Sequence, residues 1–216
     1  MKNIPVILCA VSVLLFSCNG EGSSDNAKKD SATITGPEAK TEVAAPPMDP
    51  AAIEKIMIAY ATPGDMHKWM AKLNGTWEAT VIEFMNPVKP DTSKAINTVN
   101  MTLNGLYQVG KFTGKMMGRS FEGQSIMGYD NAKKLFVSTW IDNFGSGITQ
   151  FTGTYDEKTK TLNLKGHQTD PVSGNDVGIR EEMIMIDNDS YLMIMYGTGP
   201  DGKEAKFMEG TFRRKK

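Results

Sequence analysis

Apolar and polar positions alternate with period two along the chain from Gly75 to near its end. We expect strands near residues 75–85, 94–104, 106–116, 120–129, 134–142, 147–155, 160–168, 177–187, 190–197 and 203–213. Turn-forming residues separate them, as in the run Gly199 to Gly202. About ten short strands joined by hairpin-length turns predict an all-β antiparallel meander that closes into a barrel, because closure removes exposed edges. A two-sheet sandwich is the alternative.

A helical period precedes the strands and predicts two short helices. Asp49 is an N-cap residue and Pro50 fits the first helical position, while Thr62 and Asp65 repeat a start signal. The first apolar stripe comprises Ile53, Ile56, Met57 and Tyr60, and the second comprises Met66, Trp69, Met70 and Leu73. His67 lies off the second stripe. Each helix should therefore bury one face.

Residues 183–186 and 192–196 depart from alternation, because they are apolar on both faces. One face should line the barrel interior, and the other could be covered by the N-terminal helices or by a second copy of the chain. The sequence contains 15 methionines. Methionine suits an adaptable pocket for an apolar ligand, and equally it fills gaps in a solid core.

The N-terminus has the features of a secretory signal. Lys2 supplies a positive charge, and the apolar stretch from Ile4 to Phe16 is shorter than the roughly 20 residues of a membrane-crossing helix. Leu15, Ser17 and Cys18 then resemble the lipobox of bacterial lipoproteins, whose cysteine carries the lipid. This resemblance implies an anchor at Cys18 and a place in the bacterial cell envelope, in the periplasm or at the outer membrane.

The rest of the chain divides simply. We expect a signal peptide over 1–17, lipidated Cys18 with a flexible polar linker over 18–48, and one folded domain over 49–216. Cys9 would leave with the signal, so the mature chain would contain no free thiol. Lysine plus arginine number 24 against 25 aspartate plus glutamate, and this near-neutral balance argues against nucleic acid as a partner.

The sequence contains no convincing catalytic motif. The glycines of residues 197–202 match GxGxxG, but a strand-like segment follows, so we interpret them as a hairpin turn. No serine lies in GxSxG, and Glu181 and Glu182 are adjacent in a strand and must point to opposite faces. His67 and His167 are the only histidines. We therefore predict no catalytic residue, no metal site and no cofactor. An enzyme would need Asp142, Glu122 or His167 to converge on one cleft.

A polar and aromatic set could line a ligand pocket. Trp140 and Asp142 share a strand face with Phe136 and Ser138. If this face points inward, Trp140 offers a stacking wall and Asp142 a buried acceptor, which needs a cationic partner. If it points outward, Asp142 is a solvated residue near a turn. The predicted ligand-binding residues are Trp140, Asp142, Arg180, Arg119, Tyr129 and Tyr196.

Four segments together carry a family resemblance: residues 63–69 (PGDMHKW), 73–77 (LNGTW), 128–131 (GYDN) and 139–142 (TWID). They resemble the bacterial domain of unknown function 1579 over about residues 60–213, a family that implies no particular activity. Gly75 and Trp77 on the first strand also look like the lipocalin arrangement, in which an arginine of the last strand closes the barrel over the tryptophan. Arg213 or Arg214 could fill that role, and we assign it to Arg213.

The combined prediction is a lipid-anchored, lipocalin-like (calycin-like) barrel that binds a small, largely apolar molecule in its interior. The membrane would be a partner only through the lipid. The alternative is a structural or protein-interaction module with a filled barrel, which could form a homodimer through its exposed apolar strand pair.

Overall fold

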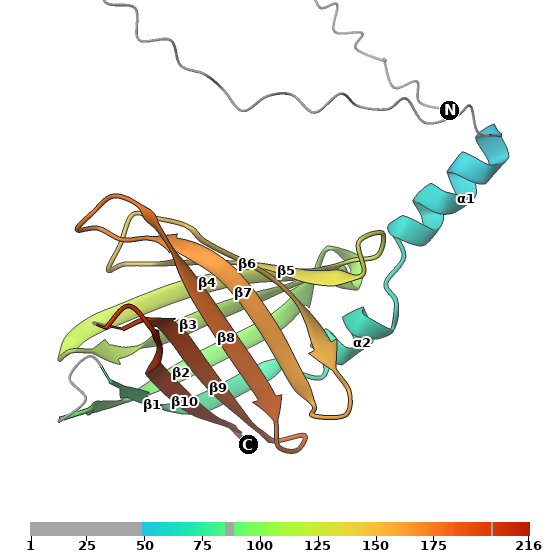
Figure 1. Ribbon diagram of the computed structural model, residues 1–216. Helices are drawn as coiled ribbons and strands as arrows, with labels where there is room; N and C mark the ends of the chain where they lie inside the picture. Colours follow the sequence, from blue (N-terminus) through green and yellow to red (C-terminus); the bar gives the residue numbers. More distant parts are fainter. Residues whose placement is uncertain (1–48, 85–88, 200) are drawn as a thin grey trace, which may run out of the picture. The chain divides into compact units, whose positions relative to one another are not determined.

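The chain from Gly75 onward folds into a closed antiparallel barrel in a computed structural model, which describes residues 49–84, 89–199 and 201–216 (Figure 1). The strands are β1 Gly75–Glu83, β2 Asp91–Thr102, β3 Tyr107–Met116, β4 Arg119–Asp130, β5 Leu135–Asp142, β6 Thr149–Asp156, β7 Thr161–Thr169, β8 Asp176–Met185, β9 Ser190–Thr198 and β10 Glu204–Arg214. The predicted signal peptide, Cys18 and the linker lie outside the described residues.

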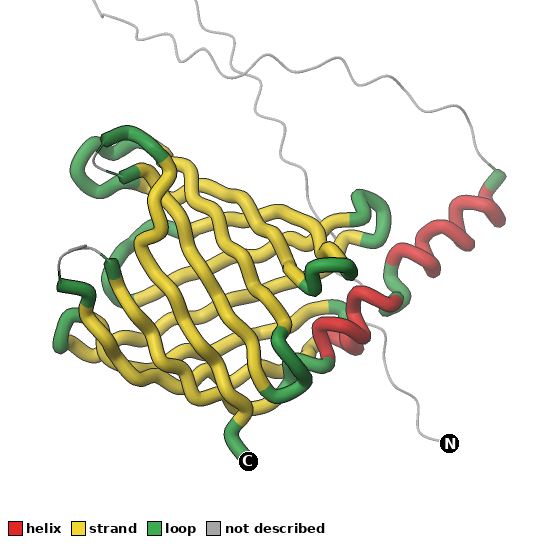
Figure 2. The backbone as a smooth tube through the Cα atoms, turned by 60° about the horizontal axis from the view of Figure 1, so that its bottom comes forward, coloured by secondary structure: helices red, strands yellow, loops and turns green. Residues whose placement is uncertain are grey.

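The barrel has the simplest topology that ten strands allow. Each strand pairs antiparallel with its neighbour in sequence, and β10 closes the wall by pairing with β1, where Trp77 lies opposite Arg214. Figure 2 shows the crossing strands of the two sides of this wall. The predicted barrel is confirmed in place of the sandwich. The predicted strands agree with the observed ones within a few residues, and 197–202 is a hairpin turn whose Gly199 N–H donates to the Lys203 carbonyl at 2.7 Å.

Two α-helices precede the strands, as predicted, but they pack differently. Asp49 caps α1 (Pro50–Tyr60) through its side chain, yet no residue of α1 is buried. The expectation that this helix buries an apolar face is wrong, because no described side chain packs closely enough on its apolar face to bury it. A short 3₁₀ turn, η1 (Leu103–Gly105), links β2 to β3. Within the described residues, none of the helices has the length and apolar character needed to cross a membrane.

Helix α2 (Asp65–Ala71) closes one end of the barrel. Its Met70 is fully buried, and the ring of Trp69 lies 5.4 Å from that of Phe136 on β5. Gln108 on β3 donates to the Met70 carbonyl at 2.6 Å, and the buried Trp77 donates from Nε1 to the Leu73 carbonyl at 2.9 Å. The second apolar stripe therefore packs into the barrel and seals this end.

His67 belongs to the same closure, although it lies off the predicted stripe. Only 2% of its surface is exposed, and its Nδ1 accepts a hydrogen bond at 3.0 Å from the N–H of Gly64, which caps α2 in place of the predicted Thr62. The ring also meets the edge of Tyr129. Burial lowers the pKa of His67, so the imidazole is held as a neutral acceptor.

The cation that covers Trp77 is Arg214, and the prediction of Arg213 is wrong. The Arg214 guanidinium lies 4.1 Å from the Trp77 ring centroid and donates to the carbonyls of Lys72, Asn74 and Asn188. Arg213 is exposed. Side chains alternate along a strand, and the buried Phe212 fixes the inward row of β10, so Arg214 and not Arg213 points toward Trp77.

The outer face of the β8–β9 hairpin keeps apolar residues at the surface. Ile184, Leu192 and Ile194 are half-buried, and Ile186 is exposed. Helix α1 is exposed throughout, and the principal contacts of α2 are with β2, β3 and β4. Cover by the N-terminal helices is therefore not what the described chain shows, and cover by a second copy stays a prediction.

Candidate functional site

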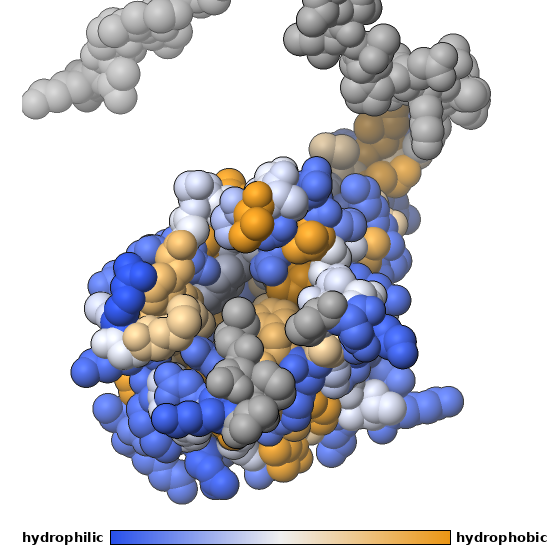
Figure 3. Space-filling view, turned by 60° about the vertical axis from the view of Figure 1, so that its left-hand side comes forward, coloured by the Kyte–Doolittle hydropathy of each residue, from blue (hydrophilic) through white to orange (hydrophobic). Residues whose placement is uncertain are grey.

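The inward rows of the strands change in character along the barrel axis. Near α2, Phe136, Leu162 and Phe212 are almost fully buried. Farther from α2, inward-facing side chains keep exposed surface although the wall is closed around them: Asn97, Phe112, Ser125, Ser138, Trp140, Glu181, Met193 and Met195. Such side chains border open space inside the barrel. Figure 3, turned toward the end opposite α2, shows a hollow with hydrophobic residues inside a largely hydrophilic rim.

Trp140 and Asp142 both lie on the inner wall, which settles the orientation that the sequence left open. The indole of Trp140 lies against Gly123 of β4, where any added Cβ would overlap the ring, and it stacks with Phe121 at 6.3 Å and 19°. Its Nε1 donates to Asp142 Oδ2 at 2.8 Å, and Asp142 Oδ1 accepts from the Phe144 N–H at 2.9 Å. These contacts fix the aromatic wall in one orientation.

Neither Arg119 nor Arg180, the two arginines among the predicted ligand-binding residues, is the cationic partner of Asp142. Arg119 is exposed at the rim, with its guanidinium 4.8 Å from the Phe144 ring centroid. Arg180 points outward, because it lies between the inward-facing Ile179 and Glu181 on β8. Asp142 is instead satisfied by Trp140 and by backbone. A carboxylate near the end of a strand can take neutral donors, so an ionic partner was not required.

The other predicted residues lie apart from this pair. Tyr129 faces inward near the closed end, where its ring contacts those of His67 and Phe136. Tyr196 lies on the outer face of β9, opposite Arg180. Glu122 and His167 are also exposed on the outside, whereas Asp142 faces the interior, so these three do not share one cleft.

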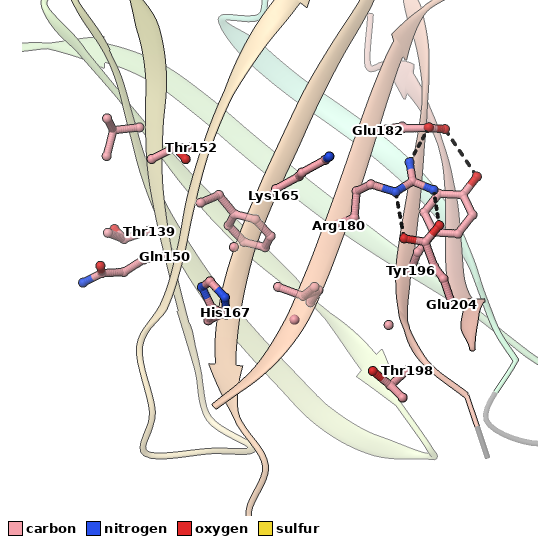
Figure 4. A pocket seen from close by; sticks show the side chains of 16 residues that line it. Thr139, Gln150, Thr152, Lys165, His167, Arg180, Glu182, Tyr196, Thr198 and Glu204 are labelled. Atoms are coloured by element: carbon pink, nitrogen blue, oxygen red, sulfur yellow. Dashed lines mark hydrogen bonds and ion pairs between the residues drawn. The ribbon is translucent and has the colours of Figure 1, made fainter. Parts of the chain in front are cut away.

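A second concavity of about 1210 Å³ runs over the outer face of β5 to β10 (Figure 4). At one end Arg180 forms a two-pronged pair with Glu204, at 2.8 and 3.0 Å, and also binds Glu182. The Tyr196 ring lies 3.8 Å below the guanidinium and its hydroxyl donates to Glu182. Hydrogen bonding to Arg180 lowers the pKa of Glu204. These charges satisfy one another, which leaves little for a ligand to gain from them.

Glu181 is the feature that the sequence interpretation missed. Its side chain points into the barrel from β8, and burial without a compensating partner raises its pKa to about 7. No hydrogen bond or ion pair joins it to another described residue. Protein surrounds this side chain, yet part of its surface stays exposed. A carboxylate that borders the hollow has both properties. The signal was present in the row Ile179, Glu181, Met183, where one carboxylate interrupts an inward apolar series.

Tyr191, which is linked to Asn97, is a polar neighbour of Glu181 in the barrel. Tyr191 is buried, stacks on Phe212 at 4.3 Å, and accepts a hydrogen bond at 3.3 Å from Asn97 on β2. Burial raises the pKa of Tyr191 and the nearby Glu181 adds to that effect. Nearer the open end, Glu83 Oε1 is buried without a hydrogen-bond partner, and burial raises the pKa of Glu83. Among the described residues, no group of histidine, cysteine and carboxylate side chains is arranged to hold a metal ion.

The fold and its hollow define a lipocalin-like antiparallel barrel. A crystal structure of the protein Rv2717c from M. tuberculosis matches with a TM-score of 0.56 at 8% identity, covering 72% of this chain and 100% of that one. The S-type phycobiliprotein lyase from Guillardia theta gives 0.49 at 10% identity over 76% and 97%. A redesigned β-barrel gives 0.37 at 16% identity over 68% and 95%. At 8% identity, the likeness to Rv2717c concerns the fold alone.

The family follows from the sequence itself. The profile of the family described as "Protein of unknown function (DUF1579)" matches residues 62–214, and the chain belongs to that family. This confirms the resemblance carried by its four motif segments. No protein with a curated description matches the chain.

Proposed function

We propose that this protein binds a small, largely apolar molecule inside the barrel and is held in the bacterial cell envelope by lipid on Cys18. The observation that carries the binding role is the half-exposed inward row of the barrel. Phe112, Trp140, Met193 and Met195 lie on inward rows and pack against the core, yet each keeps exposed apolar surface. Concave apolar sites with a few polar groups are the usual form of small-molecule sites.

The two ends of the barrel support a site with a single entrance. At one end α2, Trp77 and Arg214 fill the lumen. At the other, the wall carries the fixed indole of Trp140 and the flexible side chains of Met193 and Met195. Aromatic faces offer a rigid contact surface and methionines adapt to the outline of a ligand. A filled barrel, which the interaction-module alternative requires, would bury these residues completely.

The anchor rests on the sequence alone. Leu15, Ser17 and Cys18 supply the lipobox-like pattern, and the polar segment that follows would separate the barrel from the lipid surface. A tethered binding protein of this kind would take up its ligand near the membrane, in the periplasm or at the outer membrane.

The test uses Nile red, a neutral apolar dye that fluoresces when it leaves water. We expect the protein to bind one equivalent of Nile red. Ser138→Phe, which adds a ring on the inner wall, should weaken binding at least tenfold, because an overfilled pocket excludes the dye. The matched control is Thr139→Phe, one residue further along β5 and in the outer groove.

The two variants separate the two concavities. Loss of Nile red binding in Ser138→Phe with retention in Thr139→Phe supports the interior site. Retention in Ser138→Phe with loss in Thr139→Phe would assign the dye to the outer groove and overturn the proposal. Absence of binding by the unmodified protein would overturn it as well.

A further inference from the structure

The barrel interior combines apolar walls with carboxylates that lack cationic partners. On the inward rows of the described strands, the two arginines are Arg214, engaged at the closed end, and Arg119, at the exposed rim. The inward carboxylates are Glu181, Asp142 and, opposite each other on β1 and β2, Glu83 and Asp91. Among the described residues, the part of the hollow between its two ends therefore carries carboxylates and no cation.

Resting on the proposed function, we infer that the ligand is an apolar molecule with a protonated amine, and that Glu181 is the counter-ion of that amine. A buried carboxylate without a partner is costly unless something pairs with it. No described residue does so, and a ligand ammonium placed beside Glu181 would supply both the charge and the hydrogen bond.

The walls around Glu181 suit the rest of such a molecule. Met183 follows on the same inward row, Met195 lies opposite Glu181 in the pairing with β9, and Leu164 lies opposite it on β7. Phe112 and Trp140 contribute aromatic surface elsewhere on the inner wall, with their rings 6.3 Å apart. Aromatic faces also attract cations, so the same walls accept the apolar body and tolerate the charge.

A ligand that carries a carboxylate would be repelled by the same interior. It would bring a negative charge into a hollow that already holds Glu181, where no cation on the described inward rows lies away from the two ends of the barrel to receive it. Like charges in a low-dielectric space repel strongly, and one of them would have to take up a proton. The interior should therefore discriminate against apolar acids and in favour of apolar amines.

The experiment compares dansylcadaverine, a fluorescent dye with a primary amine, with its N-acetylated and uncharged derivative. At pH 8, where Glu181 is mostly ionised, we expect the protein to prefer the amine by about tenfold. Glu181→Gln should reduce this preference to less than about twofold. Glu182→Gln, which removes the same charge from the outer face of the same strand, should leave it unchanged.

Repeating the dye comparison at lower pH tests the same role of Glu181 without a mutation. Tyr191 is the titratable side chain that faces Glu181 from β9, and its raised pKa keeps it neutral at pH 8, while β7 contributes apolar Leu164 and β2 the uncharged Asn97. Protonation of Glu181 at pH 5.5 should therefore abolish the preference for the amine without changing affinity for the acetylated dye.

Nile red separates failure of this inference from failure of the proposed function. If the protein binds Nile red but shows no preference for the amine, including the case in which neither dansyl dye binds, the counter-ion role of Glu181 is wrong and the apolar site stands. A preference for the amine that survives Glu181→Gln would likewise overturn the counter-ion role and leave the apolar site standing. If Nile red does not bind, both ideas are overturned.

Discussion

The closed end and the hollow differ in how their polar groups are satisfied. At the closed end, Trp77 donates to a carbonyl, His67 accepts from the Gly64 N–H and Arg214 donates to three carbonyls. In the hollow, Glu181 has no described partner, and the same is true of Glu83 Oε1. Both regions are built from inward rows of the same strands.

The difference separates an end of the barrel that serves the stability of the fold from a hollow that we propose as the binding site. Natural proteins satisfy nearly all their buried polar groups, and the closed end follows that rule. An unpartnered carboxylate in an apolar interior destabilises the fold, so its presence suggests a site that something else completes. The two ends can therefore be separated by mutations that change stability in opposite directions.

The largest effect should come from comparing the two inward tryptophans. Trp77→Ala removes a fully buried ring and its hydrogen bond, and we expect a loss of about 3–5 kcal/mol in the free energy of unfolding. Trp140→Ala should lose only about 1–2 kcal/mol, because part of that ring already faces open space. Urea denaturation measures both. Equal losses would mean that Trp140 belongs to a solid core.

Glu181→Gln should raise stability, with a marked pH dependence. The pKa of Glu181 is raised from 4.5 to about 7 in the folded protein, so folding favours the protonated acid and ionisation opposes it. The penalty is absent below about pH 4.5, grows as the pH rises, and levels off above about 7 near 3 kcal/mol.

Unfolding by urea at pH 4.5 and pH 8 checks this sign. The variant should match the unmodified protein at the lower pH and exceed its stability by up to about 3 kcal/mol at the higher one. Glu182→Gln is the matched control and should show no such gain at pH 8. A variant less stable than the parent at pH 8 would contradict the idea of an uncompensated carboxylate.

The smallest of the three effects distinguishes the neighbouring arginines of β10. Arg214→Ala removes several hydrogen bonds and the stack on Trp77, and should cost about 2 kcal/mol. Arg213→Ala changes an exposed side chain and should stay within about 0.5 kcal/mol. Thermal unfolding of the two variants measures both losses of stability. A larger loss for Arg213→Ala would return the closing role to that residue.

The sequence predicted the strands well, because alternation and turn residues are local signals. Trp140 and Asp142 were also correctly grouped, since residues two apart in a strand share a face. Which row of a strand faces inward is not a local signal, because turns of different length can present either row to the interior. Arg180 and Tyr196, two of the predicted ligand-binding residues, therefore point outward. The adjacent Glu181 and Glu182 exclude a neighbouring acid and base pair, but the burial that distinguishes Glu181 depends on the closed wall and is not a local signal.

The side-chain amide of Asn131, in the turn between β4 and β5, donates to the carbonyls of Tyr60 and Thr62 at 3.0 and 2.9 Å and shares one of these N–H groups with the Ala59 carbonyl at 3.4 Å. These carbonyls end α1 and begin the connection to α2. Any pulling force passed from the N-terminal side through α1 would therefore meet this turn of the barrel wall before it reached the packed residues of α2.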